Sequence, residues 1–543
     1  MQDRVRERFQ IEDMPGRLRS ARVDDGSCML RRLILAATLL VTGCASLPVD
    51  YARPESYALQ DTDATWLGQT VQGALRTHPG QNAFRALPDG TDALLARVYL
   101  AEAAERSLDL MYFAWHDDGV GRMMANALLR AADRGVRVRL LLDDIGAQVD
   151  DNGMMALGGH PNIEIRLFNP IASRGNRVLG ALTDLRRINR RMHNKAFIAD
   201  NQRAILGGRN IGDEYFDAHD EWNFGDLDVL TAGPVVGEVS VAFDLYWNAP
   251  MVYPIKALTG RRHEIASLDA LRMQLSAFVE LQHNNPYADN VRSQVAEILA
   301  SDSPNVFWGA AHVLYDQPSK ITQDRNVTEG HLFPQFASLG LSPERQLTIV
   351  SPYFIPGDAG ADWLTGLVRR GVGVTVLTNS LASTDVAMVH SAYKRYRGRL
   401  IDGGVTIYEL RPDAFIVGRD SDNEKSLDRT EAALHAKTFF IDHRAVFIGS
   451  LNLDPRSIQL NTEIGIVCES VAMAEALRGR LEPRLPRIAW RLERIVDEWG
   501  ASRIVWLEAN EQGVRQRLVE PDVSLWRKLG AWFFGLLPIE SQL

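Results

Sequence analysis

The sequence predicts an α/β protein in which two copies of one folding unit pack as a pseudo-twofold pair around a shared site. Helix and strand patterns alternate along the chain, the whole pattern occurs twice, and one polar motif appears in each repeat. Equivalent segments keep a nearly constant offset, which is 239 residues from Ser107 to Gln346 and 242 residues from His193 to His435. Such an offset indicates an internal duplication, and two copies are too few for a solenoid.

The composition is that of an ordinary globular protein, with 46% hydrophobic and 24% charged residues in a chain of 543. This length exceeds one typical domain and fits a duplicated pair with additional segments. The formal net charge of −9 argues against non-specific nucleic-acid binding, which usually needs a basic surface. We therefore expect no nucleic-acid partner.

The first 89 residues divide into three segments. Residues 29–43 combine two arginines with a nine-residue apolar stretch, which is too short to span a bilayer and is typical of a signal peptide. The ending LVTGC resembles a bacterial lipoprotein signal cleaved before Cys44, which would then carry lipid. Residues 1–28 are expected to be an untranslated or unstructured extension. The proline-containing residues 44–89 are interpreted as a membrane tether and an irregular arm.

The first predicted domain covers 90–252 and alternates helices with strands. Residues 92–105 have helical spacing, and SLDLMYFAW is a predicted strand. A second helix over 121–135 ends at a glycine, and the apolar VRVRLLLDD is typical of a central parallel strand. With another strand at 162–168, this alternation indicates a βαβ arrangement.

The second predicted domain, 344–500, repeats this order. QLTIVSPYFIP matches SLDLMYFAW, the helix over 361–371 matches the one that ends at Gly135, VGVTVLTNS matches VRVRLLLDD, and VTIYEL matches IEIRLF. The intervening residues 253–343 are a predicted helical insertion, interpreted as a connector packed on the outside. The alternative is that its AAHVLYDQPSK stretch borders a substrate channel.

The tail, 501–543, contains the apolar and aromatic stretch LWRKLGAWFFGLLP, which is too short to span a bilayer. Tryptophan together with a mixed apolar face fits a helix that lies in the membrane interface. A C-terminal core helix is the equally weighted alternative.

One polar motif occurs in each copy, with the same spacing. The first copy contains His193, Lys195, Asp200, Gly208 and Asn210, and the second contains His435, Lys437, Asp442, Ser450 and Asn452. On an extended strand, alternation places the histidine and the lysine of one motif on the same face. Two copies with matched downstream spacing favour a functional motif over ordinary polar strand faces.

These residues resemble the paired motifs of the phospholipase D superfamily, and their types suit the phosphodiester chemistry that this resemblance implies. Two histidines in one pocket can divide the work, because one attacks phosphorus while the other protonates the leaving oxygen. The lysines and asparagines would supply positive charge and donors to the non-bridging oxygens. We expect no metal and no other cofactor, because two ammonium groups already neutralise the phosphate. Asp200 and Asp442 are expected to support strand and loop geometry.

A reactive histidine also needs an acidic partner that holds its tautomer. Glu463 lies 28 residues after His435 and suits this role in the second copy. The first copy offers Asp226 and Asp228, and aligning DLDVL with EIGIV places Asp226 opposite Glu463. Asp226 is therefore favoured over Asp228.

At these residues the sequence resembles the phospholipase D superfamily, whose paired motifs form one phosphodiester-processing site. The resemblance implies two phospholipase D-like αβα sandwich domains related by pseudo-twofold symmetry, with one active site at their interface. Gly208 departs from the usual serine, which puts one substrate contact in doubt, whereas Ser450 keeps it. WHDDGVGRMM, HDEWNFGDLDV, SPYFIP and LPIESQL further resemble bacterial cardiolipin synthase C-like proteins.

This resemblance implies a phosphatidyltransferase that passes a phosphatidyl group from phosphatidylglycerol or phosphatidylethanolamine, through a phosphohistidine, to phosphatidylglycerol, giving cardiolipin. We hypothesise that His193 is the nucleophile and His435 the general acid and then base; the reverse order stays open. One alternative is a phospholipase D that hydrolyses membrane phospholipids to phosphatidic acid. Another is a nuclease of the same superfamily.

The expected partners are membrane phospholipids, and an accessory membrane protein is left open. A duplicated chain contains both half-sites, so a monomer suffices for one site. Lipid attached to Cys44 would hold the protein on a bacterial cell membrane, facing the periplasm, with inner and outer membrane both open.

Overall fold

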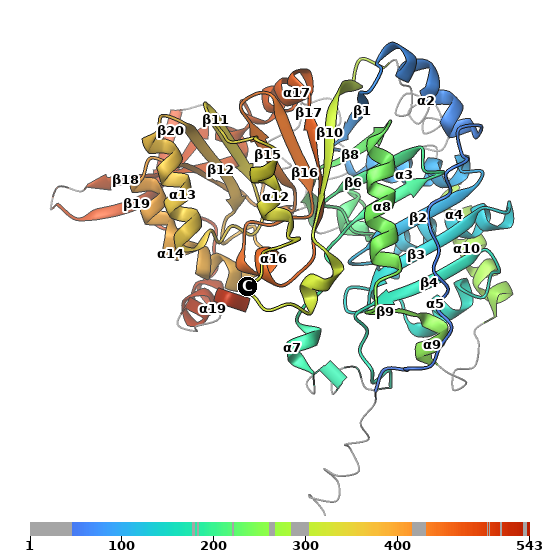
Figure 1. Cartoon of the computed structure of the whole chain (residues 1–543). Helices are drawn as coiled ribbons and strands as arrows, with labels where there is room; N and C mark the ends of the chain where they lie inside the picture. The colour runs from blue at the N-terminus through green and yellow to red at the C-terminus, as the bar shows by residue number, and fades with distance from the viewer. Residues whose placement is uncertain are drawn as a thin grey trace, which may run out of the picture. The chain divides into compact units, whose positions relative to one another are not determined.

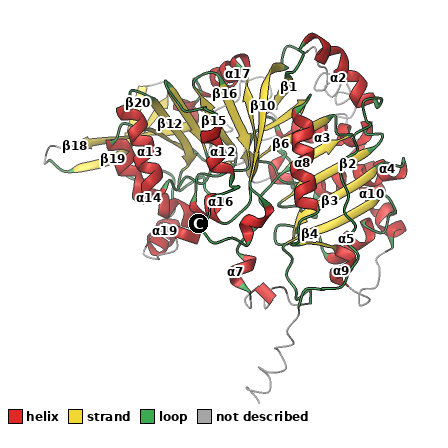
Figure 2. Cartoon of the chain, viewed as in Figure 1, coloured by secondary structure: helices red, strands yellow, loops and turns green. Residues whose placement is uncertain are grey.

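Two mixed β-sheets with matching strand order form the centre of the protein (Figures 1 and 2). The first contains, in spatial order, β1 (Asn82–Leu87), β8 (Asp228–Ala232), β6 (Arg203–Gly207), β5 (Ala196–Ala199), β2 (Ser107–Tyr112), β3 (Arg137–Asp143), β4 (Ile163–Phe168) and β9 (Val252–Pro254). The second contains β10 (Phe307–Tyr315), β17 (Ile464–Glu469), β16 (Ala445–Gly449), β15 (Lys437–Ile441), β11 (Gln346–Val350), β12 (Gly373–Asn379), β13 (Thr406–Leu410), β18 (Ala489–Val496), β19 (Ser502–Asn510) and β20 (Gly513–Arg517). This matching order confirms the predicted duplicated α/β fold.

The computed structural model describes residues 46–175, 177, 180–181, 184–219, 222–259, 267–283, 303–414, 431–496, 498, 500–510, 513–535 and 540–542. From Leu47 onward, the described residues form one compact unit. The expected extension 1–28, the expected signal peptide 29–43 and Cys44 lie outside the described residues.

Three parallel strands lie in each sheet beside the motif strand. β2, β3 and β4 pair in parallel in the first copy, and β11, β12 and β13 do so in the second. The motif strands β5 and β15 run antiparallel to β2 and β11. Because β3 and β12 are flanked on both sides, most of their side chains are buried, as their apolar sequences predict.

Helices cover the sheets, and their ends follow local sequence signals. They are α2 (Trp66–Thr77), α3 (Gly90–Ala103), α4 (Gly119–Asp133), α5 (Asp151–Leu157), α7 (Leu185–Ile188), α8 (Val235–Trp247), α9 (Ile255–Thr259), α10 (Leu268–His283), α12 (Leu332–Ser338), α13 (Gly357–Arg369), α14 (Ala387–Asp402), α16 (Pro455–Gln459), α17 (Val471–Leu481), α18 (Leu485–Ile488) and α19 (Leu525–Gly535), with short 3-10 turns η1 (Asp213–Tyr215), η3 (Pro318–Ile321) and η4 (Glu540–Gln542). Gly135 and Gly371 follow α4 and α13 with φ angles of 95° and 88°, which glycine adopts without strain. The helix ends therefore repeat together with the sheets.

An apolar core shared by the two copies fixes their arrangement. Met192 and Ile198 of the first copy belong to the same buried cluster as Phe440, Ile448 and Ile466 of the second. The burial of this apolar surface stabilises the contact between the copies. The two motif segments are therefore held against each other by packing, not only by the chain that connects them.

Two boundaries differ from the sequence prediction. Residues 44–89 were expected to be irregular, but α2 and β1 lie within them, and β1 pairs with both β8 and β10. The prolines that suggested an irregular arm fall outside these two elements. The second domain also extends past residue 500, because β19 and β20 continue its sheet by antiparallel pairing.

The prediction for 253–343, an outside connector, is wrong in its described part. Strand β10 pairs with β1 on one edge and with β17 on the other, so it joins the two sheets (Figure 1). Residues 307–309 pair with β1 and residues 310–315 pair with β17, so this strand is part of the sheets and not a connector outside them. The alternating pattern of AAHVLY was the signal for a strand here.

Helix α19 lies on the surface of α14, and no residue of α19 is buried. The core-helix alternative for the tail is therefore wrong. Trp526, Trp532 and Phe533 have 82%, 66% and 55% of their surface exposed. Among the described helices, none has both the length and the apolar character that crossing a bilayer requires.

Candidate active site

The two motif segments meet where the copies join, and their backbone bonds are arranged symmetrically. The His193 N–H donates to the Thr462 carbonyl at 2.8 Å, and the His435 N–H donates to the Gly225 carbonyl at 2.8 Å. Thr462 and Gly225 directly precede the two predicted acids, Glu463 and Asp226. Each motif histidine is therefore anchored beside the acid of the other copy.

The side chains pair in the same crossed manner. His193 Nδ1 lies 2.8 Å from Glu463 Oε2, and His435 Nδ1 lies 2.6 Å from Asp226 Oδ2. Sequence position had placed Glu463 with His435, and Asp226 with His193. The structure exchanges these partners, because the facing copies bring each acid across to the opposite histidine. The spacing of these residues along the sequence does not show which acid will reach which histidine.

Asp228, the other acid of the first copy, has a different role. Its carboxylate is fully buried and lies 2.8 Å from Arg97 Nη2 and 3.4 Å from Arg209 Nη1. These two ion pairs balance the negative charge of Asp228 within the first copy. Of the two acids that the sequence offered, Asp226 is the one that reaches a histidine.

The motif lysines share the pocket with both histidines. Lys195 Nζ donates to the His193 carbonyl at 2.7 Å, and Lys437 Nζ donates to the His435 carbonyl at 2.5 Å. Burial lowers the pKa of both lysines, that of Lys437 to about 8. Burial, followed by the charges of both lysines, lowers the pKa of His193, and burial together with Lys437 and Lys195 lowers that of His435 to about 4. The four groups therefore face one site.

The two acids differ in their electrostatic state. Burial would raise the pKa of Asp226, but the hydrogen bond and charge of His435, with Lys437, hold it below the ordinary value. Burial raises the pKa of Glu463 to about 7 against the opposing charge of Lys195. Asp226 is thus ionised at neutral pH, whereas Glu463 titrates there.

The motif aspartates lie at turns after the motif strands. Asp200 Oδ1 accepts the N–H groups of Arg106 and Ser107, each at 2.8 Å. Asp442 Oδ1 accepts the N–H of Gln346 at 2.9 Å and is placed equivalently in the second copy. Both aspartates have positive φ angles, 52° and 50°, and tie the turn to the first residues of β2 and β11. Their role is to hold strand geometry.

The two asparagines are not equivalent. Asn210 Oδ1 accepts the Ala114 N–H at 3.1 Å, and its Nδ2 donates to the Tyr215 hydroxyl at 2.9 Å. The Tyr215 ring lies edge-on to His435 with centroids 5.2 Å apart. Asn210 therefore positions the Tyr215 ring beside His435, in addition to the predicted donation of a hydrogen bond to the substrate. Asn452 Oδ1 is buried and has no hydrogen-bond partner among the described residues.

Gly208 and Ser450 lie beside the two acids, Asp226 and Glu463. The Ser450 hydroxyl donates to Glu463 Oε2 at 2.5 Å and accepts the Ile464 N–H at 3.0 Å. At Gly208, a Cβ would overlap with the carboxylate of Asp226. Aspartate is one methylene shorter than glutamate, so its carboxylate lies nearer the backbone and leaves no room for a side chain. The smaller Gly208 therefore occurs with the shorter acid Asp226 in the first copy, whereas Ser450 occurs with the longer Glu463 in the second copy.

Two further positioning residues were missed from the sequence. Asp143 Oδ2 accepts the Met192 N–H at 3.0 Å, and Asn379 Oδ1 accepts the Leu434 N–H at 2.8 Å. Met192 and Leu434 directly precede the motif histidines, so the two contacts are equivalent. The sequence did contain a signal that these two residues are equivalent. Both lie in the matched strands VRVRLLLDD and VGVTVLTNS, at an offset of 236 residues.

Asp316 holds the acid of the second copy. Its Oδ2 accepts the Glu463 N–H at 2.8 Å and lies 2.9 Å from Lys320 Nζ, and both Asp316 and Lys320 are buried. These residues belong to AAHVLYDQPSK, which the alternative sequence interpretation placed on a substrate channel. In the structure these two residues form a buried support for Glu463.

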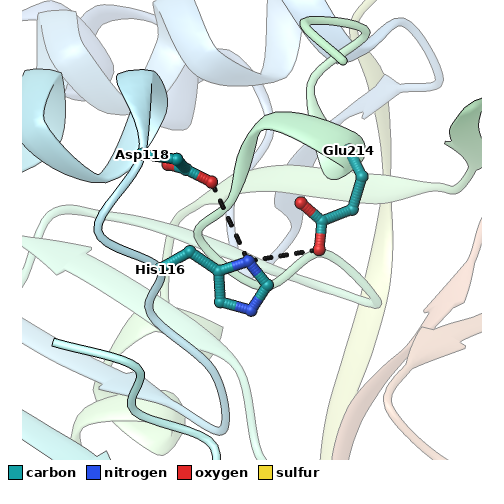
Figure 3. A group of neighbouring side chains, drawn as sticks. All are labelled: His116, Asp118 and Glu214. Carbon is teal, nitrogen blue, oxygen red and sulfur yellow. Dashed lines mark ion pairs between the residues drawn. The ribbon is translucent and has the colours of Figure 1, made fainter. Parts of the chain in front are cut away.

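One described group has a spacing that a cation would accept. His116 Nδ1 lies 3.3 Å from Glu214 Oε1 and 3.8 Å from Asp118 Oδ2 (Figure 3). Asp118 Oδ1 also accepts the Gly121 N–H at 2.8 Å and so caps α4, and Asp118 Oδ2 accepts the Asp213 N–H at 2.8 Å. We interpret this group as an ion-paired support beside Tyr215, because both Asp118 oxygens already accept backbone N–H groups.

Comparison with known proteins agrees with this arrangement. The family profile described as "Cardiolipin synthase, PLD-like domain" matches residues 99–247 and 341–484, one segment in each copy. Cardiolipin synthase C of Escherichia coli (strain K12) is 40% identical over 496 residues, covering 88% of this chain and 99% of the relative. An uncharacterized protein of Helicobacter pylori (strain ATCC 700392 / 26695) is 33% identical over 520 residues, covering 93% and 98%.

Among solved structures, the phosphatidylserine synthase of Haemophilus influenzae Rd KW20 superposes with a TM-score of 0.53 at 13% sequence identity. The superposition covers 88% of this chain and 100% of that one. At this identity the likeness concerns the fold alone.

The contact between Gly208 and Asp226 gives a testable prediction. Gly208→Ser should lower stability by about 1–3 kcal/mol and reduce activity, because the added atoms overlap with a carboxylate that His435 holds in place. Adding Asp226→Glu, which copies the Ser450–Glu463 pair, should recover part of the lost stability. Thermal unfolding and product formation measure both effects. A Gly208→Ser protein as stable and active as the wild type would contradict this explanation.

Proposed function

The chain belongs to the cardiolipin synthase family of phospholipase D-like proteins, and we propose that it transfers a phosphatidyl group to phosphatidylglycerol to make cardiolipin. The donor is phosphatidylglycerol or phosphatidylethanolamine. The observation that carries the proposal is the pair of crossed histidine–acid contacts around two buried lysines. That arrangement provides a nucleophile, a proton donor and positive charge at a single phosphorus atom.

The reaction proceeds in two displacements at phosphorus. In the first, one imidazole nitrogen bonds to the donor phosphorus, and the bond to glycerol or ethanolamine oxygen breaks as the other imidazole protonates that oxygen. In the second, this other imidazole removes the proton from the acceptor hydroxyl, whose oxygen bonds to phosphorus as the phosphorus–nitrogen bond breaks. The lysine ammonium groups stabilise the charge on the non-bridging oxygens in both steps.

The assignment of His193 as nucleophile stays a prediction, because the two imidazoles occupy equivalent positions. Both have a lowered pKa, so both are neutral at neutral pH. A bound phosphate is an opposite charge that raises the pKa of a nearby imidazole and so favours protonation of the acid. The ionised partner carboxylate holds Nδ1–H on the nucleophile and keeps its Nε2 lone pair available.

The proposal includes a membrane location. The exposed aromatic residues of α19 suit a helix that lies in a lipid interface. A lipid on Cys44, which lies outside the described residues, would hold the site beside its substrates and raise their effective concentration. We propose a bacterial cell membrane with the site facing the periplasm, and no second copy is needed to complete the site.

Lipid analysis tests the function directly. The purified protein should form cardiolipin from vesicles of phosphatidylglycerol, with and without added phosphatidylethanolamine. His193→Ala and His435→Ala should each lower product formation by about 10³-fold or more, because neither half-site completes the cycle alone. Arg515→Gln, an exposed change on β20, is the matched control and should keep full activity. Phosphatidic acid without cardiolipin would instead indicate the hydrolase.

The pKa shifts predict a bell-shaped pH profile. Activity should rise as Glu463 loses its proton near pH 7, because the ionised carboxylate orients His193 for attack. It should fall as Lys437 loses its proton near pH 8, because the ammonium charge is then lost. A phosphodiester substrate does not titrate in this range, so the limbs belong to the protein. A kcat/KM profile that is flat through both limbs would contradict this assignment.

A further inference from the structure

A cavity rich in arginine adjoins the active site. Its volume is about 940 Å³, and Phe113 forms part of its wall. The Phe113 ring lies edge-on to the His193 ring with centroids 5.2 Å apart, and Lys195 Nζ lies 5.4 Å from the same ring centroid. A single aromatic side chain therefore stands between this arginine-lined cavity and two motif residues.

The arginine-lined cavity carries excess positive charge. Its described lining contains five arginines and one aspartate, which are Arg186, Arg190, Arg191, Arg325, Arg456 and Asp324. The charge of Arg191 is balanced by Asp143 at 2.8 Å. Asp324 lies 3.6 Å from Arg186, and both are largely exposed to solvent. The remaining arginines of the lining are Arg190, Arg325 and Arg456.

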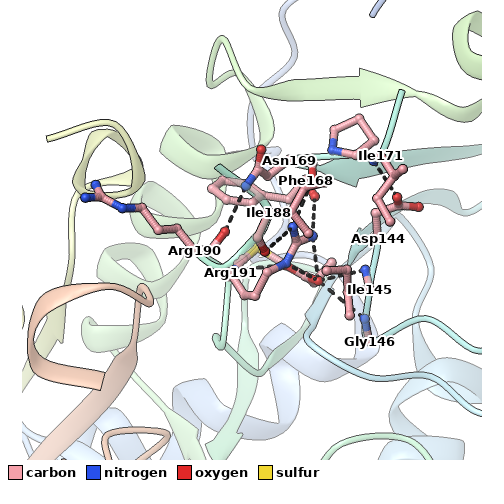
Figure 4. Close-up of polar contacts among 12 residues, drawn as sticks. Asp144, Ile145, Gly146, Phe168, Asn169, Ile171, Ile188, Arg190 and Arg191 are labelled. Carbon is pink, nitrogen blue, oxygen red and sulfur yellow. Dashed lines mark hydrogen bonds and ion pairs between the residues drawn. The ribbon is translucent and has the colours of Figure 1, made fainter. Parts of the chain in front are cut away.

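Two of these guanidinium groups are held by neutral oxygen atoms. Arg190 Nη1 donates to the Ile321 carbonyl at 3.2 Å, and Arg456 Nη1 donates to Asn189 Oδ1 at 2.7 Å. Neither Arg190 nor Arg456 forms an ion pair in the described part of the chain. Figure 4 shows Arg191 within its polar network and the Arg190 side chain extended away from it. Neutral oxygen atoms thus hold both guanidinium groups in place.

The arginines also act on one another and on the active site. Burial, then the charges of Arg186 and Arg325, lower the pKa of Arg190. The charge of Arg456 contributes to the lowered pKa of His193, after burial and the two lysines. Repulsion between like charges held in place favours the binding of an anion between them. Arginine suits a phosphate because its planar donors match the phosphate oxygens.

We infer that the arginine-lined cavity binds the phosphate of the acceptor phospholipid, an inference that rests on the proposed function. Cardiolipin contains two phosphatidyl groups joined by one glycerol. The donor phosphate and the acceptor phosphate must therefore lie close together during the transfer. The lysines and histidines take the phosphate that reacts, so the phosphate that does not react needs positive charge close by. With its phosphate in this cavity, the acceptor extends its terminal hydroxyl past Phe113 to the phosphohistidine.

The surroundings of the cavity suit a lipid. Leu185, Ile188 and Leu460 add apolar surface to its wall. Gln542, in the turn that follows α19, lines the cavity as well, and its carbonyl accepts a hydrogen bond from Arg456 Nη1 at 3.0 Å. In Figure 1, α7 and α19 lie on the same lower side of the unit. Helix α19 and helix α7, whose residues line the cavity, therefore lie on the same side of the unit in this view.

The test compares a charged acceptor with a neutral one in the full-length protein. Vesicles of phosphatidylglycerol with added butanol yield cardiolipin through the lipid acceptor and phosphatidylbutanol through a small alcohol without phosphate. Arg325→Gln and Arg456→Gln should each lower the ratio of cardiolipin to phosphatidylbutanol by about tenfold, because a charge-assisted contact to the acceptor is lost. Arg325→Lys should retain more of this ratio than Arg325→Gln, and Arg515→Gln should leave it unchanged.

Arg186→Glu provides a second variant at a position that is 86% exposed, where the fold tolerates the change. It should lower the same ratio by reversing a charge at the rim. If all these variants keep the wild-type ratio, or lower both products equally, the inference is overturned while the proposed function stands. A wild-type protein that forms phosphatidylbutanol and no cardiolipin overturns both.

Discussion

The hydrogen bonds that cross between the copies determine the rest of this site. Each histidine takes both its backbone anchor and its acidic partner from the opposite copy, so neither copy contains a complete reactive group. The shared apolar core and the β1–β10 pairing hold the copies at the separation that these contacts require. Catalysis by the proposed route therefore depends on the contact between the copies as much as on the motifs themselves.

Burying several charged groups in one pocket is unfavourable unless each has a partner. The crossed pairs meet this requirement, and supports such as Asp316 and Asp143 hold the backbone around them. The same burial displaces the pKa values of the lysines, the histidines and Glu463. The fold thus stabilises a set of charges that a bound phosphate would complete, and the adjoining arginines extend positive charge toward a second phosphate.

The sequence predicted the duplicated fold, the motif residues and both acids. Hydrophobic periodicity and the constant offset between equivalent segments are both visible in the amino-acid sequence itself. It did not predict which acid serves which histidine, since that depends on how two facing surfaces meet. It missed Asp143 and Asn379, whose function is visible only once their strand ends lie beside the motif segments. It placed β10 outside, because a strand that pairs on both edges has no sequence signal of its own beyond alternation.

The crossed pairing of His435 with Asp226 is tested most directly by the ring nitrogens of the histidines. Nitrogen-15 spectra of protein with labelled histidine, with His193→Ala used to assign the signals, report which ring nitrogen carries the proton. Asp226→Asn should change the Nδ1 signal of His435 and leave that of His193 near its wild-type position. If Asp226→Asn instead changes His193 and leaves His435 unaffected, the acids serve their own copies and the account of the site is wrong.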